Sequence, residues 1–323
     1  MVERDGEEMK GCRRRPALWQ LRSRALELGR RTLVMGVVNV TPDSFSDGGL
    51  FLEPEAAVAQ ALQLLEEGAD LLDLGAESTR PGSRVGFSVA SAAGVGGAPA
   101  VSAEEEQARL LPVLRGILKT RPEAIVSVDT YKAETARAAL DCGAEIVNDV
   151  SGFGWDPGLA AVCAAAKCGV VLMHSRGRPD EWAGQSPLGA DELLEMVRAG
   201  LRASLDKAAE AGIAAEAIVL DPGYGFGKRG EENFALLARQ AELLELGRPL
   251  LAGVSRKSFL GRAIAPLYDG KTAPVDARET ASLAGMVAAI LHGASVVRVH
   301  TVRAAVEAAL VADAVLLQMT DCS

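Results

Sequence analysis

AIVSVDTYKAETARAALDCGAEIVN, residues 124–148, is the stretch that decides the fold. Its first apolar run ends in Asp129, a segment with helical periodicity follows, and Gly143 ends that helix before a second apolar run begins. The same junction, a glycine and an alanine before a polar residue, recurs at 68–70 and 293–295. The stretch is therefore one copy of a repeated strand–helix unit.

Eight apolar runs of this kind lie along the chain. They cover Thr32–Asn39, Asp70–Leu74, Ala124–Asp129, Glu145–Asn148, Val170–His174, Ala217–Asp221, Pro249–Ser255 and Ser295–His300. Most are continuous and β-branched, which is typical of parallel strands covered on both faces. Helical stretches such as 191–211 separate them, with one apolar stripe at i, i+3 and i+4 spacing. Eight alternating units predict right-handed crossovers and an α/β fold, the (β/α)8 TIM barrel.

Two segments fall outside these units. Residues 31–320 are expected to form a single domain, preceded by a polar N-terminal extension, residues 1–30, in which a helix is predicted at Trp19–Leu28. Residues 83–100, rich in glycine, alanine and serine, form an insertion after the second strand. Such a composition buries few side chains, so we expect a mobile loop there. The sequence assigns no role to either segment.

Composition and charge exclude several classes of protein. The 323 residues are 49% hydrophobic and carry a formal net charge of −9, which argues against a nucleic-acid partner. The five cysteines have no C-x-x-C spacing, and with three histidines they give little support for a zinc site. The charged N-terminus is not typical of a signal peptide, and no apolar run reaches the roughly 18 residues of a membrane helix. We expect a cytoplasmic protein with reduced thiols.

Polar residues stand where the predicted strands end. They are Asn39, Asp129, Asn148, His174, Asp221, Lys257, Arg298 and His300. In a TIM barrel the reacting groups come from the carboxyl ends of the strands, so these side chains should converge on one rim. A single aspartate at a strand end is more often a helix cap or a turn residue, and His174 alone is more simply a satisfied core or rim histidine. Eight polar residues at the strand ends are harder to explain as caps, turns and core residues.

The residue types at this rim suit a flat ring and a phosphate. Carboxylates and an amide at Asp129, Asn148 and Asp221 offer acceptors and donors to a nitrogen-rich heterocycle. Buried carboxylates need a counter-charge, which Lys257 could supply. The pair 298 and 300, an arginine and a histidine, points to one side of the last strand and suits phosphate oxygens. The oxygen of an asparagine at position 39 is a plausible ligand for Mg²⁺.

Two long motifs resemble the signatures of the dihydropteroate synthases. They are GVVNVTPDSFSDGG at 36–49 and DLGAESTRPG at 73–82. Shorter matches follow in the family's order: Ser127–Thr130, Asn148–Gly152, Leu172–His174, Asp221–Gly223, Gly227–Lys228, Ser255–Ser258 and Arg298–His300. The resemblance covers about residues 31–320. It departs from the family at the insertion 83–100, at Ser175, at Thr301 and at Tyr224, which concerns the amine substrate more than the pterin.

The resemblance implies the following site residues. The pterin would be held by Asp129, Asn148, Asp221 and Lys257, with Met173 and Val150 beside the ring, and Asp129, Asp221 and Lys257 would be the catalytic residues. The diphosphate would lie on Thr79, Arg298, His300 and, through Mg²⁺, Asn39. The amine substrate, p-aminobenzoate, would meet Phe45, Arg80, Pro81 and Ser258.

The resemblance also implies the reaction. A pterin diphosphate, 6-hydroxymethyl-7,8-dihydropterin diphosphate, would condense with p-aminobenzoate to give 7,8-dihydropteroate and diphosphate, with sulfonamides as competitors of the amine. A homodimer through the last helices is implied too. Two alternatives remain: a methyltransferase that uses a methyl-tetrahydrofolate on the same barrel, and a non-catalytic pterin-binding relative, for which the insertion 83–100 is the support.

Overall fold

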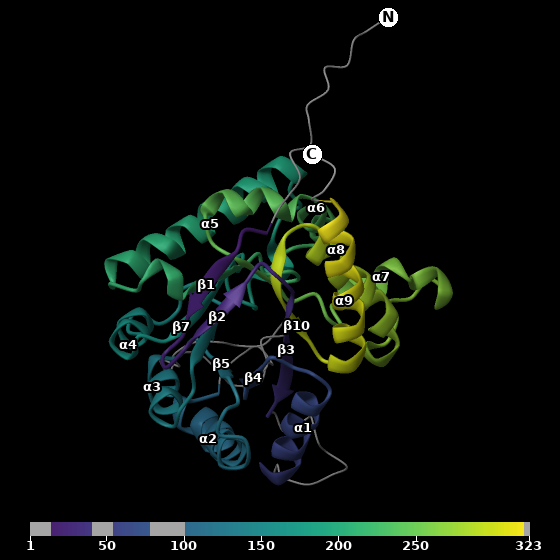
Figure 1. Cartoon of the computed structure of the whole chain (residues 1–323). Coiled ribbons are helices and arrows are strands. Elements are labelled where there is room, and N and C mark those ends of the chain that lie inside the picture. Colours follow the sequence, from purple (N-terminus) through teal and green to yellow (C-terminus); the bar gives the residue numbers. More distant parts are fainter. Residues whose placement is uncertain (1–13, 41–53, 78–100, 320–323) are drawn as a thin grey trace, which may run out of the picture.

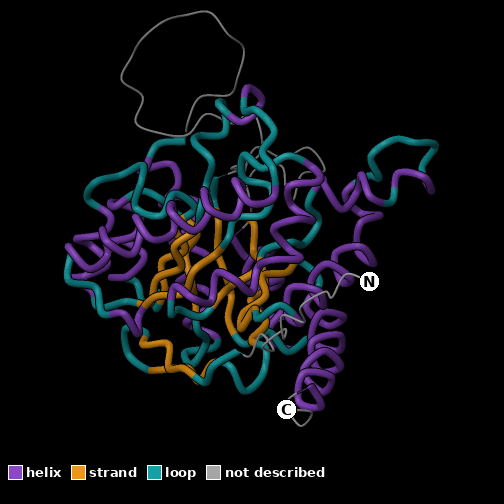
Figure 2. Tube along the Cα trace, turned by 90° about the horizontal axis from the view of Figure 1, so that it is seen from above, coloured by secondary structure: helices purple, strands orange, loops and turns teal. Residues whose placement is uncertain are grey.

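The computed structural model describes residues 14–40, 54–77 and 101–319, and within them eight parallel strands close into a barrel (Figures 1 and 2). The strands, in barrel order, are β10 (Ala294–Val299), β3 (Leu33–Asn39), β4 (Leu71–Gly75), β5 (Val126–Asp129), β6 (Ile146–Asp149), β7 (Gly169–Met173), β8 (Ile218–Asp221) and β9 (Leu250–Ala252). Each coincides within a few residues with one of the eight apolar runs. The predicted (β/α)8 TIM barrel is confirmed.

Helices between the strands cover the outside of the barrel (Figure 2). They are α1 (Pro54–Glu66), α2 (Ala103–Thr120), α3 (Ala133–Asp141), α4 (Leu159–Ala166), α5 (Ala190–Glu210), α6 (Gly230–Arg239), α7 (Ser258–Ala263), α8 (Glu279–Leu291) and α9 (Val302–Met319). Short 3-10 turns are η2 (Trp182–Gly184), η3 (Ala215–Ala217), η4 (Gln240–Leu246), η5 (Ala265–Leu267) and η6 (Val275–Arg278). Within the described segments, no helix combines the length and the apolar character that crossing a bilayer requires.

The barrel interior has an apolar lower part and a polar upper part. The side chains near the amino ends of the strands form one buried cluster, which includes Leu33, Met35, Leu71 and Val171. Successive residues of a strand point to opposite faces, so the next inward positions on β4 and β10, beyond Leu71 and Val296, are Asp73 and Arg298. On these two strands the change from apolar to polar leads toward the carboxyl rim.

An N-terminal hairpin closes the lower end of the barrel. Strands β1 (Ala17–Gln20) and β2 (Ala25–Leu28) pair antiparallel, so the predicted helix at 19–28 is wrong. The reason is a period of two: Trp19 and Leu21 are buried and the residues between and beside them are exposed. Trp19 is fully buried in the lower cluster and its indole Nε1 donates to the carbonyl of Ala217, 2.9 Å away. The segment left without a role therefore completes the core.

Candidate active site

Four polar side chains from four strands form one network in the upper barrel. The Arg298 guanidinium donates through Nε to Asp73 Oδ2 at 2.6 Å and through Nη2 to Asp129 Oδ2 at 2.8 Å. Asn148 Nδ2 donates to the same Asp73 oxygen at 3.0 Å. The structure thus brings together three residues that the sequence assigned to the site, on β5, β6 and β10.

Asp73 is the member of this network that the sequence analysis left without a role. It lies in the middle of β4 and has no exposed surface, and its Oδ1 has no hydrogen-bond partner among the described residues. A carboxylate inside an otherwise apolar buried strand is rarely tolerated without a partner, and this was the signal that could have identified it. Its partner Arg298 lies 225 positions further along the chain, which no local pattern reveals.

Asp221 and Lys257 lie close to this network, since the charges of both interact with that of Arg298. Asp221, at the end of β8, accepts a hydrogen bond at Oδ1 from the backbone N–H of Gly223 at 2.7 Å. A methyl group added to Gly253 would lie 3.7 Å from Asp221 Oδ2 and 4.0 Å from Arg298 Cβ, so both side chains flank this glycine. Lys257 precedes α7, and its ammonium Nζ lies 4.1 Å from the centre of the Phe226 ring.

An apolar wall borders these polar groups. Tyr131, Val150 and Met173 form a small buried cluster, against which the half-buried rings of Trp155 and Phe226 pack. Met173 and Val150 were assigned to the ring pocket by resemblance, and they do lie in one cluster. The two rings were missed, because aromatic residues in a loop carry no signal of what they face. A flat ring bound here would meet both polar and apolar partners.

Burial shifts the pKa values of the ionisable side chains in this site toward neutral pH. Burial raises the pKa of the Asp129 carboxyl to about 7, with Arg298 opposing the rise and Asp73 adding to it. Burial also raises the pKa of Asp221. The pKa of Lys257 is lowered to about 8. Burial is the largest cause and the charge of Arg298 the next, whereas Asp221 and Asp129 raise this pKa. Groups with perturbed pKa values that lie close together are typical of active sites.

The remaining predicted residues lie at the rim, in the core or outside the described residues. His300 follows β10, half-buried, with its ring Nδ1 3.0 Å from Ser255 Oγ. Ser258 is the exposed first residue of α7, and Asn39 is the half-buried last residue of β3. His174 is buried beneath α5, where a methyl group on Gly200 would lie 2.4 Å from its ring, but its ring Nδ1 has no hydrogen-bond partner among the described residues, so it is buried without being satisfied as expected. Phe45, Thr79, Arg80, Pro81 and the insertion 83–100 lie outside the described residues.

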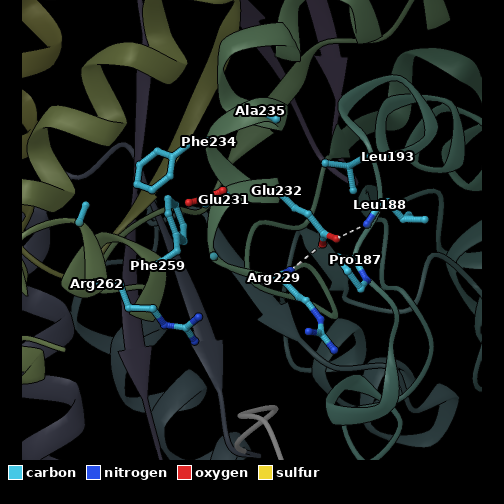
Figure 3. A pocket seen from close by; sticks show the side chains of 12 residues that line it. Pro187, Leu188, Leu193, Arg229, Glu231, Glu232, Phe234, Ala235, Phe259 and Arg262 are labelled. Carbon is cyan, nitrogen blue, oxygen red and sulfur yellow. Dashed lines mark hydrogen bonds between the residues drawn. The ribbon is translucent and has the colours of Figure 1, made fainter. Parts of the chain in front are cut away.

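A pocket of about 680 Å³ lies between α6, α7 and the segment before α5 (Figure 3). Phe234 and Phe259 line one part of it, and Glu232 crosses its floor. The Glu232 carboxylate accepts hydrogen bonds from the backbone N–H groups of Leu188 at 2.8 Å and Arg229 at 2.6 Å. These bonds fix the start of α6, directly after the glycine-rich loop, and none of the predicted site residues lines this cavity.

Comparisons with known proteins identify the family of this chain. Residues 35–300 match the family described as pterin binding enzyme. The dihydropteroate synthase of Mycobacterium leprae is 45% identical over 275 residues, which are 85% of this chain and 90% of that protein.

Two solved structures are also similar. The Xanthomonas albilineans dihydropteroate synthase with 4-aminobenzoic acid superposes with a TM-score of 0.78 at 38% identity, covering 96% of this chain and all of that chain (100%). The Yersinia pestis enzyme, in complex with a sulfonamide drug, has a TM-score of 0.79 at 36% identity and covers 93% and 99% of the two chains. The chain belongs to the pterin-binding enzymes and, among them, to the dihydropteroate synthases.

Proposed function

We propose that this chain catalyses the condensation of 6-hydroxymethyl-7,8-dihydropterin diphosphate with p-aminobenzoate, which gives 7,8-dihydropteroate and diphosphate. The observation that carries the proposal is the convergence of Asp129, Asn148, Asp221, Lys257 and Arg298 at the carboxyl ends of five barrel segments. The relatives named above are dihydropteroate synthases, and one of them holds the amine substrate.

The pterin ring would lie between the carboxylates and the apolar wall. Asp221 has one oxygen, Oδ1, on the Gly223 N–H, which leaves Oδ2 for the donors of the ring's guanidine-like edge. Asn148 would add an amide, and Met173 and Val150 would pack against a face of the flat ring. Such a mixture of a few placed polar groups and an apolar wall is typical of small-molecule sites.

The chemistry needs charge stabilisation more than a nucleophile. The pterin C–O bond would break with its electron pair leaving on the diphosphate, and the amine lone pair of p-aminobenzoate would then form the new C–N bond and release a proton to solvent. A pterin cation delocalises the positive charge, and the buried, ionised carboxylates of Asp129 and Asp221 would stabilise it. No side-chain nucleophile is required for this sequence.

Mg²⁺ would accompany the diphosphate at the rim. In the described part of the chain no three histidine, cysteine or acidic side chains are grouped so that they could hold a metal. The Asn39 amide oxygen at the end of β3 is the type of hard oxygen ligand that Mg²⁺ accepts, since this ion usually keeps its waters and takes few protein ligands beside substrate phosphates. When bound, the ion would neutralise charge on the leaving diphosphate. Arg298 and His300 would bind the same group directly.

Diphosphate release tests the function. Purified protein with Mg²⁺ and the pterin diphosphate should release diphosphate only when p-aminobenzoate is added, and a sulfonamide should raise the KM for that amine. Pterin binding without amine-dependent release would support the non-catalytic relative instead. Methyl transfer from a methyl-tetrahydrofolate would support the methyltransferase and contradict the proposal.

The rate should depend on pH as a narrow bell. Asp129 is needed as a carboxylate, which is its form above its pKa of about 7, so the rate should fall on the acid side. Lys257 is needed as an ammonium, which is its form below its pKa of about 8, so the rate should fall on the alkaline side. Measurement of kcat/KM from about pH 5 to about pH 10 checks both limbs. A profile that is flat across this range would contradict the roles of both residues.

Replacing Asn39 by Ala should weaken the response to Mg²⁺. The Mg²⁺ concentration that gives half of the maximal rate should rise about 10-fold, because a protein ligand of the ion is lost. Titration of activity with Mg²⁺ measures it, and binding of pteroic acid without Mg²⁺ should stay unchanged. An unaltered Mg²⁺ titration would remove Asn39 from the metal site.

We further propose that the chain acts in the cytoplasm as a homodimer. Exposed apolar side chains on α9 support the dimer: Leu310 is 63% exposed and Val311 is 67% exposed. A surface with several large apolar groups on one helix is typical of a contact between subunits. Light scattering of the purified protein and of a Leu310→Arg variant would separate a dimer from a monomer.

A further inference from the structure

Lys228 is a buried cation that the proposed chemistry does not use. Its ammonium Nζ donates to three backbone carbonyls: those of Gly223 at 2.8 Å, His174 at 3.1 Å and Phe226 at 3.3 Å. Two of these belong to the glycine-rich loop, residues 222–228, and the third lies just beyond the end of β7. One side chain therefore joins this loop to the neighbouring strand.

We propose that Lys228 is a positioning residue, which holds the glycine-rich loop against the end of β7 and thereby sets the places of Asp221 and Lys257 in the active site. This role rests on the proposed function, because it matters through the reaction those two residues serve. Lys228 itself touches neither of them in a hydrogen bond, so it would act through the loop.

The glycine-rich loop packs tightly against the end of β7 where Lys228 holds it. Gly223 has a φ of +72°, and a methyl group there would lie 2.0 Å from the carbonyl oxygen of His174. Gly227 has a φ of +73°, and a methyl group there would lie 2.7 Å from Arg176 Cβ. The loop backbone therefore rests directly on residues 174–176, and the backbone N–H of Arg176 donates to the Phe226 carbonyl at 3.3 Å.

The first connection runs to Asp221. The backbone of Gly223 connects Lys228 to Asp221. Its carbonyl accepts a hydrogen bond from Lys228 Nζ, and its N–H donates to Asp221 Oδ1 at 2.7 Å. The ammonium thus holds the residue that holds the carboxylate. If the loop moved away from β7, Asp221 would lose this bond and one of its two oxygens would turn toward the cavity without a partner.

The second connection runs to Lys257. The Phe226 carbonyl accepts from Lys228, while the Phe226 ring lies 4.1 Å from the Lys257 ammonium. The ring is also held edge-on by Trp182, with ring centres 5.4 Å apart. A shift of the loop would move this ring and the cation it faces together.

The geometry explains why a lysine stands at this place despite the unfavourable burial of its charge. An ammonium has three N–H donors, and three carbonyls surround it. Burial lowers the pKa of Lys228 to about 7, against the pull of Asp221, so the charge is unfavourable for stability alone. Asn233 holds the loop from the other side, through Gly225 N–H at 2.6 Å and the carbonyl of Lys228 at 3.1 Å.

A double-mutant cycle tests the proposal. Lys228→Met, Phe226→Leu, the double variant and the wild type would be compared in kcat and KM for both substrates. Lys228→Met should lower kcat/KM by roughly 10-fold to 100-fold, since small misplacements of reacting groups have effects of this size. The double variant should be within about threefold of the more impaired single variant, because both changes act through one loop.

Lys207→Met is the matched control. Lys207 is exposed on α5 and donates to a single carbonyl, that of Phe153, at 3.1 Å. Its kcat/KM should stay within about twofold of the wild type. A lysine with a merely stabilising role would change the melting temperature of the Lys228 variant but not its kcat/KM below that temperature.

Two results would overturn the proposal: wild-type kcat/KM in Lys228→Met, or losses that multiply in the double variant. Should Lys228→Met fail to fold, Lys228→Gln takes its place in the same cycle, since it keeps a donor without the charge. Should the wild type itself show no turnover, the proposed function fails. The same proteins titrated calorimetrically with pteroic acid would then still show whether Lys228 and Phe226 act together on binding.

Discussion

Replacing Asp129 by Asn is expected to lower kcat/KM by roughly 100-fold to 1000-fold while the barrel stays folded, the size of effect seen when one electrostatic group of a transition state is removed. The substitution keeps the shape of the side chain and removes its charge. The Arg298 guanidinium, which now donates to Asp129 at 2.8 Å and to Asp73 at 2.6 Å, would face one carboxylate instead of two. A cationic pterin would lose its nearest counter-charge at the same time.

Rates of diphosphate release, with both substrates varied, measure this effect. Asp206→Asn, an exposed aspartate on α5, provides the matched control and should be as active as the wild type. Circular dichroism of both variants shows whether they are folded. If Asp129→Asn retained activity within about threefold of the wild type, Asp129 would have no place in the pterin pocket.

Replacing Trp19 by Ala is expected to lower the free energy of unfolding by about 3–5 kcal/mol, the range for removing a large buried aromatic side chain. Trp19 is fully buried between the hairpin and the lower barrel interior, and its indole N–H is bonded to Ala217. The variant would leave a cavity and an unpaired carbonyl beneath the strands. At temperatures where it stays folded, its kcat should be that of the wild type, because the site lies at the other end of the barrel.

Urea unfolding followed by tryptophan-independent circular dichroism measures the stability change. Leu18→Ala is the control: this side chain is 59% exposed, and the change should be within about 0.5 kcal/mol. Equal stabilities of the Trp19 and Leu18 variants would contradict the view that the hairpin is part of the core.

The barrel could be predicted because its signal is repeated and local. Strands such as β7 are buried on both faces and read as unbroken apolar runs, and glycines such as Gly143, with a φ of +107°, end helices where left-handed backbone is needed. The hairpin β1–β2 has neither a long apolar run nor a repeated glycine signal. Its two short strands lie among charged residues, and their period of two is visible only in what each side chain packs against.

The candidate site could be predicted as a set of residues but not as a set of contacts. Strand ends gather at one rim, so the grouping of Asp129, Asn148 and Asp221 follows from the topology alone. The ion pair between Arg298 and Asp73 depends on the register and rotamers of strands far apart in the chain. The three backbone carbonyls that accept hydrogen bonds from Lys228 are placed by the path of the glycine-rich loop, and a pattern of residue types does not specify that path.

Because the hairpin closes the amino end of the barrel, only its carboxyl end is open. Everything that reacts must enter and leave past the same rim, because Trp19, Leu21 and Leu28 seal the base. If the pterin lies against Asp221 and Asn148 as proposed, it must arrive before the reactant bound nearer the opening, and the product must leave past the same rim. Initial rates with both reactants varied would reveal this compulsory sequence, and a random order of arrival would contradict it.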